Sequence, residues 1–459
     1  MNIINDTTLL LAFYGDDFTG STDAMEALAS RGYRTVLFLE APSPELLERF
    51  EGIRCIGVAG TSRAKSPEEM ALEIKPIMKQ LSELDIQTVH YKTCSTFDSS
   101  PSVGSIGEAI RVSRQFFEDQ HTIPLLVGAP ALGRYTLFGQ HFARMDGQVF
   151  RLDRHPVMSR HPSTPMHEAD LRLHLQAQLD EPIALMNILE LDGDQEERKQ
   201  RFNEKLADKP SVVLFDALDD ERLTASGQLI WEAAAEGQRF VVGSSGVEYA
   251  LTAHWEQAGI KPSEQPLKLQ EKVEPAKRIL AVSGSASPVS KRQVEDAIAQ
   301  GFHGIRIPAS ALTNNEELPQ QLLDEAVRHL NEGDSVVMYT ALGPEDEAIA
   351  ETRNQFAAHN ITGSLAGERI GRQLGRWTKI IMEQAQLRRV VIAGGDTSGF
   401  VTSEMGIYGM EMLLQISPGA PLCKVYAKDE RMDGVELALK GGQFGSVDYF
   451  TKVRDASSN

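Results

Sequence analysis

Short apolar runs alternate with amphipathic segments along the N-terminal part of the chain. LLLAFYG at 9–15 leads into STDAMEALAS at 21–30, and TVHYKTC at 88–94 is followed by SIGEAIRVSRQFF at 105–117. Apolar runs that alternate with helical segments of about 10–15 residues are typical of βαβ units and a largely parallel sheet. The pattern therefore predicts an α/β fold.

Residues 261–277, KPSEQPLKLQEKVEPAK, interrupt this alternation with three prolines, many charges and no apolar period. The alternation restarts with RILAVSG at 278–284 and continues to RRVVIAGG at 388–395. A chain of 459 residues exceeds the size at which a single core keeps growing. We therefore predict an N-terminal domain over 1–262, a linker over 263–277 and a C-terminal domain over 278–459, each α/β with a largely parallel sheet.

Composition narrows the class of protein. The net charge of −19 argues against a nucleic-acid partner, because binding to a phosphate backbone needs a basic surface. No apolar stretch approaches the roughly 18 residues that cross a bilayer, and the N-terminus lacks the basic start of a signal peptide. Three scattered cysteines indicate reduced thiols, so a cytoplasmic protein is expected. Any anion site in so acidic a chain must be locally positive or built from backbone N–H groups.

Two adjacent carboxylates, Asp16 and Asp17, follow the first apolar run, where a strand is expected to lead into a helix. Ligands of α/β sheets bind beyond the carboxyl ends of strands, at such a junction. We expect Ser21 or Thr22 to cap the helix and Asp23 to fall in its first turn, where the helix dipole favours an acid. Turn and cap chemistry explains one acid; two adjacent acids indicate a general base, a ligand for substrate hydroxyls or a Mg²⁺ site.

A second polar cluster follows the run at 88–94 and contains Lys92, Ser95 and Thr96. Lys92, at the end of a predicted strand, is a candidate counter-ion for a carboxylate, and Arg63 is a candidate bidentate one. A solvated loop with serine and threonine turns is the structural alternative.

Three loops rich in glycine and serine follow apolar runs of the C-terminal domain, at 283–288, 394–399 and 440–445. Small residues let backbone N–H groups face an anion at a helix start, so three such loops indicate a phosphate-rich ligand such as a nucleotide. The chain contains no G-x-x-x-x-G-K-[ST] motif, no protein-kinase signature and no well-placed G-x-G-x-x-G.

Together these stretches resemble the four-carbon acid sugar kinase family over nearly the whole chain. The segments that carry the resemblance are DDFTGSTD at 16–23, KTCSTFDSSPSVGSIG at 92–107, HPSTPMHEADL at 161–171, SGSASPVSKRQ at 283–293, AGGDTSG at 393–399 and LALKGGQFGSVDYF at 437–450.

The resemblance implies a kinase with a sugar-acid domain, an ATP domain and an active site in the cleft between them. With ATP and Mg²⁺, it would phosphorylate a terminal hydroxyl of a small sugar acid. The implied nucleotide contacts are Ser283, Ser285, Gly394, Gly395, Asp396, Thr397 and Gly442. The implied substrate contacts are Asp16, Asp17, Arg63, Lys92, Ser95 and Thr96. We expect Asp17, rather than Asp16, to orient or deprotonate the attacking hydroxyl.

The chain departs from the family pattern at several positions. Asp396 stands where the family often has Glu, and Gly441-Gly442-Gln443 stand where it has Ser-Gly-Asn. GAPALGRYTLFGQHFAR at 128–144 replaces a segment that usually reads like Pro-Ala-x-Pro-x-Asn-Gly-Arg-Thr. The substrate is therefore left open between 3-oxo-tetronate, threonate or erythronate and a branched relative such as 3-oxo-isoapionate.

Two other classes of function stay open at this point. A non-catalytic sensor could bind the same sugar acid or nucleotide, and an NAD(P)-dependent dehydrogenase has thinner support because its fingerprint is missing. The expected partner is a small sugar acid, with no nucleic acid and no membrane, and a homo-oligomer is an open alternative to a monomer.

Overall fold

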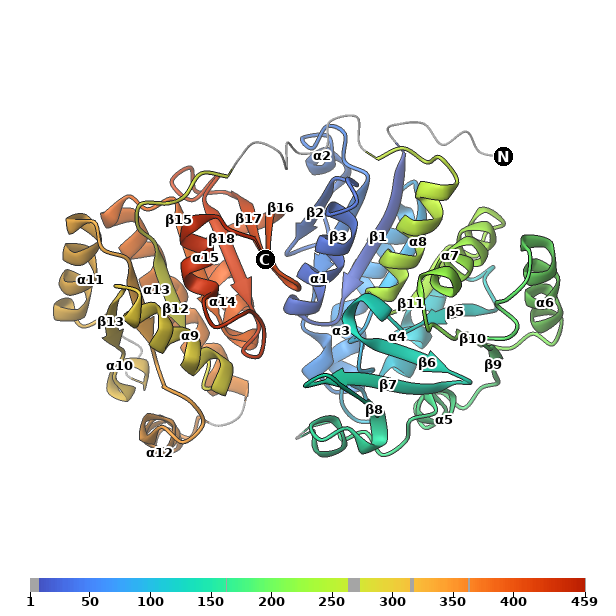
Figure 1. Ribbon diagram of the computed structural model, residues 1–459, viewed down its shortest axis with the longest axis horizontal. Helices are drawn as coiled ribbons and strands as arrows, with labels where there is room; N and C mark the ends of the chain where they lie inside the picture. Colours follow the sequence, from blue (N-terminus) through green and yellow to red (C-terminus); the bar gives the residue numbers. More distant parts are fainter. Residues whose placement is uncertain (1–7, 162, 263–272, 314–317, 362–363, 459) are drawn as a thin grey trace. The chain divides into compact units, whose positions relative to one another are not determined.

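The structure, a computed structural model, describes residues 8–161, 163–262, 273–313, 318–361 and 364–458 (Figure 1). The chain divides into two compact units, residues 1–266 and 267–459. Of the linker predicted for 263–277, residues 263–272 lie outside the described residues. Within the described part, no helix combines the length and apolar character that crossing a bilayer requires.

The first unit contains a sheet with the strand order β2-β3-β1-β4-β11-β5-β10-β9, in which all neighbours pair in parallel. Four of its eight strands are buried along their whole length and three more at all but one residue, as expected for a parallel sheet covered on both faces. Its strands are β1 (Leu9–Gly15), β2 (Thr35–Phe38), β3 (Cys55–Ala59), β4 (Ile86–Lys92), β5 (Ile123–Leu126), β9 (Ile183–Met186), β10 (Val212–Phe215) and β11 (Phe240–Gly243).

Two groups of helices cover this sheet: α1, α7 and α8 pack together, and α3 packs with α4 behind the sheet in Figure 1. The helices of the unit are α1 (Phe18–Ala29), α2 (Pro44–Leu47), α3 (Pro67–Glu83), α4 (Ile106–Ser113), α5 (Leu171–Gln176), α6 (Gln195–Ala207), α7 (Asp220–Ala235) and α8 (Gly246–Gln257). Short 3-10 turns are η1 (Ser62–Ala64), η2 (Arg114–Phe116), η3 (Pro130–Leu132), η4 (Leu152–Arg154) and η5 (Met158–Arg160).

The start of α1 differs from the prediction. Asp17 is the N-cap, because its side chain accepts a hydrogen bond from the backbone N–H of Gly20. The expectation that Ser21 or Thr22 caps the helix was therefore wrong, and Asp23 falls in the second turn rather than the first. An aspartate caps as well as a serine does, so an acid two residues after a strand is enough to start the helix earlier.

A small antiparallel sheet, which the sequence reasoning missed, stands apart from the main one. It consists of β6 (Arg134–Leu137), β7 (Gln140–Met145) and β8 (Gln148–Arg151). Both two-residue turns have positive φ at both positions, at Phe138-Gly139 (51° and 82°) and Asp146-Gly147 (49° and 78°). Such turns match the twist of a hairpin, and Asp-Gly is their strongest sequence signal.

The second unit contains a mixed sheet with the order β13-β14-β12-β15-β18-β17-β16. Neighbours from β13 to β18 pair in parallel, and β17 pairs antiparallel with both β18 and β16. The largely parallel α/β prediction is confirmed, with this hairpin as an unpredicted addition. The strands are β12 (Leu280–Ser283), β13 (His303–Arg306), β14 (Val336–Tyr339), β15 (Arg389–Ala393), β16 (Ile407–Ser417), β17 (Ala420–Ala427) and β18 (Glu436–Lys440).

In the second unit α9 packs with α15, and α13 packs with α11 and α14. The longest of these helices, α13, spans 22 residues. The helices are α9 (Pro288–Ala299), α10 (Ala309–Thr313), α11 (Gln320–Glu332), α12 (Glu347–Ala358), α13 (Ser364–Ala385), α14 (Gly395–Glu404) and α15 (Tyr449–Asp455).

Candidate functional site

Three predicted site residues of the first unit meet at one edge of its sheet. The register places Gly15 at the end of β1 opposite Ala59 on β3 and opposite Lys92 on β4. The loops that follow these strands therefore start side by side. They carry Asp16 and Arg63 at the carboxyl edge, where α/β sheets bind ligands.

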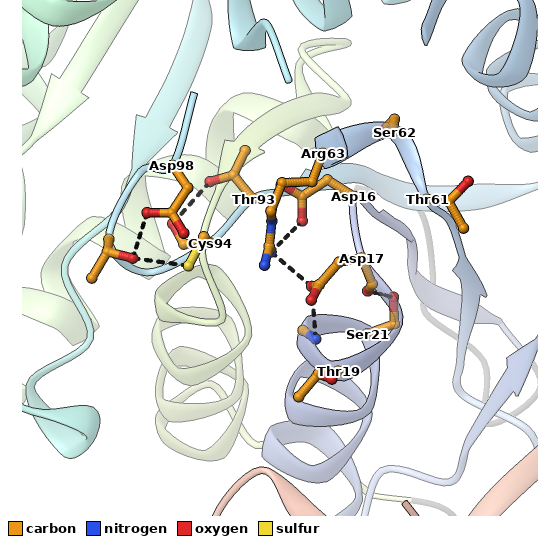
Figure 2. A network of polar contacts seen from close by, with 12 residues as sticks. Asp16, Asp17, Thr19, Ser21, Thr61, Ser62, Arg63, Thr93, Cys94 and Asp98 are labelled. Carbon is orange, nitrogen blue, oxygen red and sulfur yellow. Dashed lines mark hydrogen bonds and ion pairs between the residues drawn. The ribbon is translucent and has the colours of Figure 1, made fainter. Parts of the chain in front are cut away.

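Asp16, Asp17 and Arg63 form one ion cluster (Figure 2). The guanidinium of Arg63 binds Asp16 with two hydrogen bonds, Nη2 to Oδ1 at 2.6 Å and Nε to Oδ2 at 3.1 Å. The same Nη2 lies 2.7 Å from Oδ1 of Asp17. Asp17 also caps α1 through Gly20 at 2.8 Å. Both acids are thus engaged within the protein, and the arrangement holds Arg63 rigidly at the edge of the sheet.

The two acids differ in exposure. The side chain of Asp16 is 4% exposed and that of Asp17 is 29% exposed, so Asp17 is the one that a ligand can reach. Burial raises the pKa of Asp16, and the guanidinium of Arg63 opposes this shift. Desolvation lowers the pKa of Arg63, but the neighbouring Asp16 and Asp17 outweigh it and hold that pKa above its ordinary value. Arg63 therefore stays charged.

Lys92 brings a second cation to this cluster. The residue is buried, and its ammonium makes no hydrogen bond or ion pair with a described residue. A Cβ atom placed on Gly20 would lie 2.2 Å from Nζ of Lys92 and 2.4 Å from Oδ1 of Asp17. Only glycine lets the first turn of α1 approach the lysine this closely. Burial raises the pKa of Asp16 and of Asp23, and the nearby charge of Lys92 opposes both shifts.

The loop after β4 is held by hydrogen bonds of its own. The hydroxyl of Thr96 donates to Asp98 at 2.8 Å and lies 3.0 Å from Sγ of Cys94. The backbone carbonyl of Ser95 accepts from Nε2 of His141 on β7 at 2.8 Å. Burial lowers the pKa of His141 to about 4, so the ring is neutral at pH 7. Sequence reasoning missed His141, since no motif marks it; the Asp-Gly hairpin signal beside it was the available clue.

The structure therefore brings Asp16, Asp17, Arg63 and Lys92 together. It turns the hydroxyl of Thr96 toward Asp98 within its own loop. The hydroxyl of Ser95 makes no hydrogen bond with a residue that the structure describes. The structural alternative for Asp17, a helix cap, is present together with the ion cluster, so the cap and a ligand role are compatible.

The predicted loops of the second unit also share one edge of a sheet. Ser283, Ala393 and Lys440 lie in one row across β12, β15 and β18. The backbone N–H of Gly284 donates to Ala393 at 3.0 Å, and that of Gly394 donates to Lys440 at 2.9 Å. The three glycine- and serine-rich loops thus begin next to one another.

Hydrogen bonds hold two of these loops, those at 283–288 and 440–445, against the start of α9. Ser287 caps the helix by accepting from the N–H of Ser290 at 3.0 Å. The hydroxyls of Ser287 and Ser290 both donate to the carbonyl of Gly442. Ser285 accepts from the N–H of Ser287 at 3.2 Å, and a Cβ on Gly442 would lie 2.7 Å from its hydroxyl oxygen. Ser285 and Gly442 are therefore packed against the helix start.

The third loop starts α14 without a side-chain cap. Gly394 has φ 143°, and its N-cap position makes no side-chain hydrogen bond. Uncapped N–H groups at a helix start are donors for an anion, and the helix dipole favours one there. Gly395 and Thr397 lie in this first turn; Asp396 does too, but its side chain lies outside the described residues.

Two further features of this edge point to a ligand. The hydroxyl of Ser283 is fully buried and has no hydrogen-bond partner in the described structure. A largely apolar cavity of about 500 Å³ opens beside the loop after β12, lined by Gly284, Ala286, Ile349 and Phe356 among others. Orphaned buried hydroxyls are uncommon in folded proteins, and an apolar cavity of this size suits an organic ligand.

Clusters with metal-ligating side chains lie elsewhere. Among the described residues, His303, Glu325 and His329 form one such group, and His329, Glu332 and Asp334 form another. His303 is the first residue of β13, so these groups lie at the amino edge of the sheet, opposite to the loops.

Two family models match the chain. One, described as a sugar-binding N-terminal domain, matches residues 11–251, and the other, described as a nucleotide-binding C-terminal domain, matches residues 280–450. The 3-oxo-isoapionate kinase of Paraburkholderia graminis is 43% identical over 450 residues, 97% of this chain and 94% of that kinase. The 3-oxo-tetronate kinase of Pseudomonas savastanoi pv. phaseolicola is 28% identical over 456 residues, 98% of each chain.

A crystal structure of a Haemophilus influenzae protein has the same fold. It matches with a TM-score of 0.73 and 23% identity, over 96% of this chain and 99% of that one. At this identity the likeness supports the α/β architecture alone.

Proposed function

Since this chain belongs to the four-carbon acid sugar kinase family and is an acid sugar kinase, we propose that its substrate is 3-oxo-isoapionate. In this proposal the γ-phosphate of ATP passes to a terminal hydroxyl of that acid. The observation that carries the choice of substrate is the 43% identity to a 3-oxo-isoapionate kinase, against 28% to a 3-oxo-tetronate kinase, both over nearly the whole chain.

In the proposed complex, Arg63 and Lys92 bind the carboxylate of the acid. Nη1 of Arg63 and Nζ of Lys92 make no hydrogen bond with a described residue, so both are available to a ligand. In a chain with a net charge of −19, these two cations offset the charges of Asp16 and Asp17 and offer N–H donors to an anion at this edge of the sheet.

Asp17 is the proposed residue for the attacking hydroxyl. With 29% of its side chain exposed it can accept a hydrogen bond from a substrate, whereas Asp16 at 4% cannot without moving. Asp16 is then a positioning residue that fixes Arg63 through two hydrogen bonds. Phosphoryl transfer depends mostly on such positioning and on electrostatic stabilisation.

The second unit is proposed to bind ATP. The orphaned hydroxyl of Ser283 and the uncapped start of α14 fit phosphate oxygens, and the adjacent cavity of about 500 Å³ fits the nucleoside. We propose Ser283, Ser285, Gly394, Gly395, Asp396, Thr397 and Gly442 as the residues of this site. Ser285 and Gly442 would act by shaping the loop, because they are packed against α9.

Mg²⁺ would neutralise charge on the phosphates of ATP. Asp16 and Asp17 do not fit a metal site of their own, because the guanidinium of Arg63 already binds both carboxylates. Mg²⁺ is commonly held by phosphates and water with few protein carboxylates, and a metal bound in that way needs nothing further from the described residues.

A cytoplasmic location is part of the proposal, because three cysteines scattered along the chain are typical of reduced thiols. Whether the protein forms a homo-oligomer stays a prediction that light scattering would decide.

The test is an ADP-release assay with ATP, Mg²⁺ and a panel containing 3-oxo-isoapionate, 3-oxo-tetronate, threonate and erythronate. We expect the highest kcat/KM with 3-oxo-isoapionate and phosphate on a terminal carbon of the product by NMR. Asp17→Asn should lower kcat by at least about 100-fold, the usual contribution of a positioned base. A higher kcat/KM with another acid would overturn the substrate. No ADP with any acid would favour a sensor, and a change in NAD(P)H absorbance would favour a dehydrogenase.

A further inference from the structure

Lys440, the last residue of β18, is a buried cation with a single partner. The residue is 1% exposed, and its ammonium donates one hydrogen bond, to the hydroxyl of Ser290 at 3.2 Å. No carboxylate among the side chains that the structure describes forms an ion pair with it. Burial lowers its pKa to about 8. Buried charges are normally paired, so this one is an exception that calls for a reason.

Arg389 in the same unit shows what a structural buried cation looks like. It is 3% exposed, binds Glu436 at 2.6 Å and donates to the carbonyls of Glu274 and Val453 at 2.8 and 2.9 Å. Each of the three nitrogens of that guanidinium donates to the protein. Lys440 has one hydroxyl instead, which leaves two of its three N–H donors without a partner in the described structure.

The position of Lys440 is electrostatically unfavourable in the absence of an anion. Ser290 is the third residue of α9, so the ammonium lies at the positive end of that helix dipole. Folding stability alone would select an acid here. The orphaned hydroxyl of Ser283 lies in the same row of the sheet, and residues paired in register on parallel strands point to the same face.

We propose that Lys440 binds the polyphosphate tail of the nucleotide, at the start of α9 and on the same side of the sheet as Ser283. The inference rests on the proposed function in one respect, that the second unit binds ATP. A phosphate oxygen there would accept from the free N–H groups of the ammonium, pair with its charge and complete the helix start. Lys440 would thus contribute to the affinity for phosphates, and it would have no part in binding the nucleoside.

The test compares Lys440→Met with Lys428→Met, which removes an exposed lysine of the same unit. Calorimetric titrations with ATP, ADP and adenosine separate the phosphates from the nucleoside. We expect Lys440→Met to raise the Kd for ATP and for ADP by at least about tenfold, as for the loss of a hydrogen-bonded charge. The Kd for adenosine should rise by less than twofold. Lys428→Met should change none of the three Kd values by more than twofold.

Thermal unfolding without nucleotide excludes a structural role. Replacing an unpaired buried charge by an apolar side chain of similar length is expected to leave the Tm unchanged or to raise it. A structural lysine would instead lower the Tm of Lys440→Met. Equal ATP affinity of wild type and Lys440→Met, or an equal loss for ATP and adenosine, would overturn the inference. No binding of ATP by the wild type would overturn the proposed function.

A second measurement covers the case in which Lys440→Met does not fold. At pH 8.5 about half or more of Lys440 is neutral in the free protein, and a bound phosphate raises its pKa. The wild type should therefore take up a fraction of a proton on binding ATP, seen in buffers of different ionisation enthalpy, and none on binding adenosine. Equal proton uptake with both ligands would contradict the proposal.

Discussion

Arg63→Met should destabilise the first unit far more than a surface substitution does, because it leaves a buried carboxylate without its counter-ion. Asp16 is 4% exposed and loses contacts at 2.6 and 3.1 Å, and removal of one partner of a buried pair costs about 3–5 kcal/mol. The pair with Asp17, which is 29% exposed, adds about 1 kcal/mol or less. We expect the free energy of unfolding to fall by about 4 kcal/mol at pH 7.5.

The loss should depend on pH with a defined sign. Burial already raises the pKa of Asp16, and Arg63 is the main group that opposes this shift. Without Arg63 the pKa rises further, so the folded state binds a proton more tightly than the unfolded state does. The free energy of unfolding of the variant then decreases as pH rises from about 4, the ordinary pKa of Asp, through the raised value. The deficit relative to wild type should be smallest at pH 4.

Tryptophan fluorescence reports on this unit alone in a Trp377→Phe background. Trp231 and Trp255, which are 7% and 0% exposed, lie in the first unit, and Trp377 lies in the second. Urea unfolding of the four proteins of a double-mutant cycle, with Asp16→Asn as the second change, gives the coupling. Asp16→Asn should restore about 2 kcal/mol to Arg63→Met.

Arg31→Met is the matched control. Arg31 and Glu256 form a pair at 3.2 Å whose side chains are 50% and 72% exposed, so its loss should cost less than about 1 kcal/mol. An Arg63→Met deficit no larger than that of Arg31→Met, or one that Asp16→Asn does not reduce, would refute the reasoning.

Three other outcomes follow from the described contacts. Gly20→Ala places a methyl group 2.2 Å from Nζ of Lys92. The KM for the acid should rise at least tenfold, and the free energy of unfolding should fall by about 1–3 kcal/mol. Kinetic constants equal to those of the wild type would contradict the close approach. Burial raises the pKa of Asp216 to about 6, so its contribution to the free energy of unfolding decreases as pH rises from about 4 to 6. Asp216→Asn should remove this pH dependence. Urea midpoints that follow pH as those of the wild type do would contradict this. The thiol of Cys94, whose pKa burial raises to about 11, should react slowly with maleimide at pH 7.5 and faster at each step to pH 9.5; a plateau near pH 8 would contradict it.

Local patterns in the sequence predicted the parallel parts of both sheets well. Each apolar run near 9–15, 88–94 and 278–284 became a buried strand, because a parallel strand covered on both faces needs continuous apolar residues. The β6–β8 sheet and the β16–β17 hairpin were missed. Their strands are antiparallel and joined by two-residue turns, Asp146-Gly147 and Pro418-Gly419, so they lack the helix between strands that marks a βαβ unit.

Side-chain partnerships could not be read from the sequence. Asp16, Asp17 and Arg63 were predicted to act on a substrate, but that Arg63 binds both acids depends on the register of β1 and β3, which the sequence does not state. Lys440 looked like one more residue of a glycine-rich loop. Its burial and its hydrogen bond to Ser290 depend on how α9 packs against β18, which the sequence does not give.

Among the residues that the structure describes, one hydrogen bond joins the small β6–β8 sheet to the loop after β4, from Nε2 of His141 to the carbonyl of Ser95. The backbone that presents Ser95 and Thr96 is thereby braced from outside the main scaffold. A substitution at His141 should therefore shift the backbone of this loop, which belongs to the proposed sugar-acid site, without changing any strand of the main sheet.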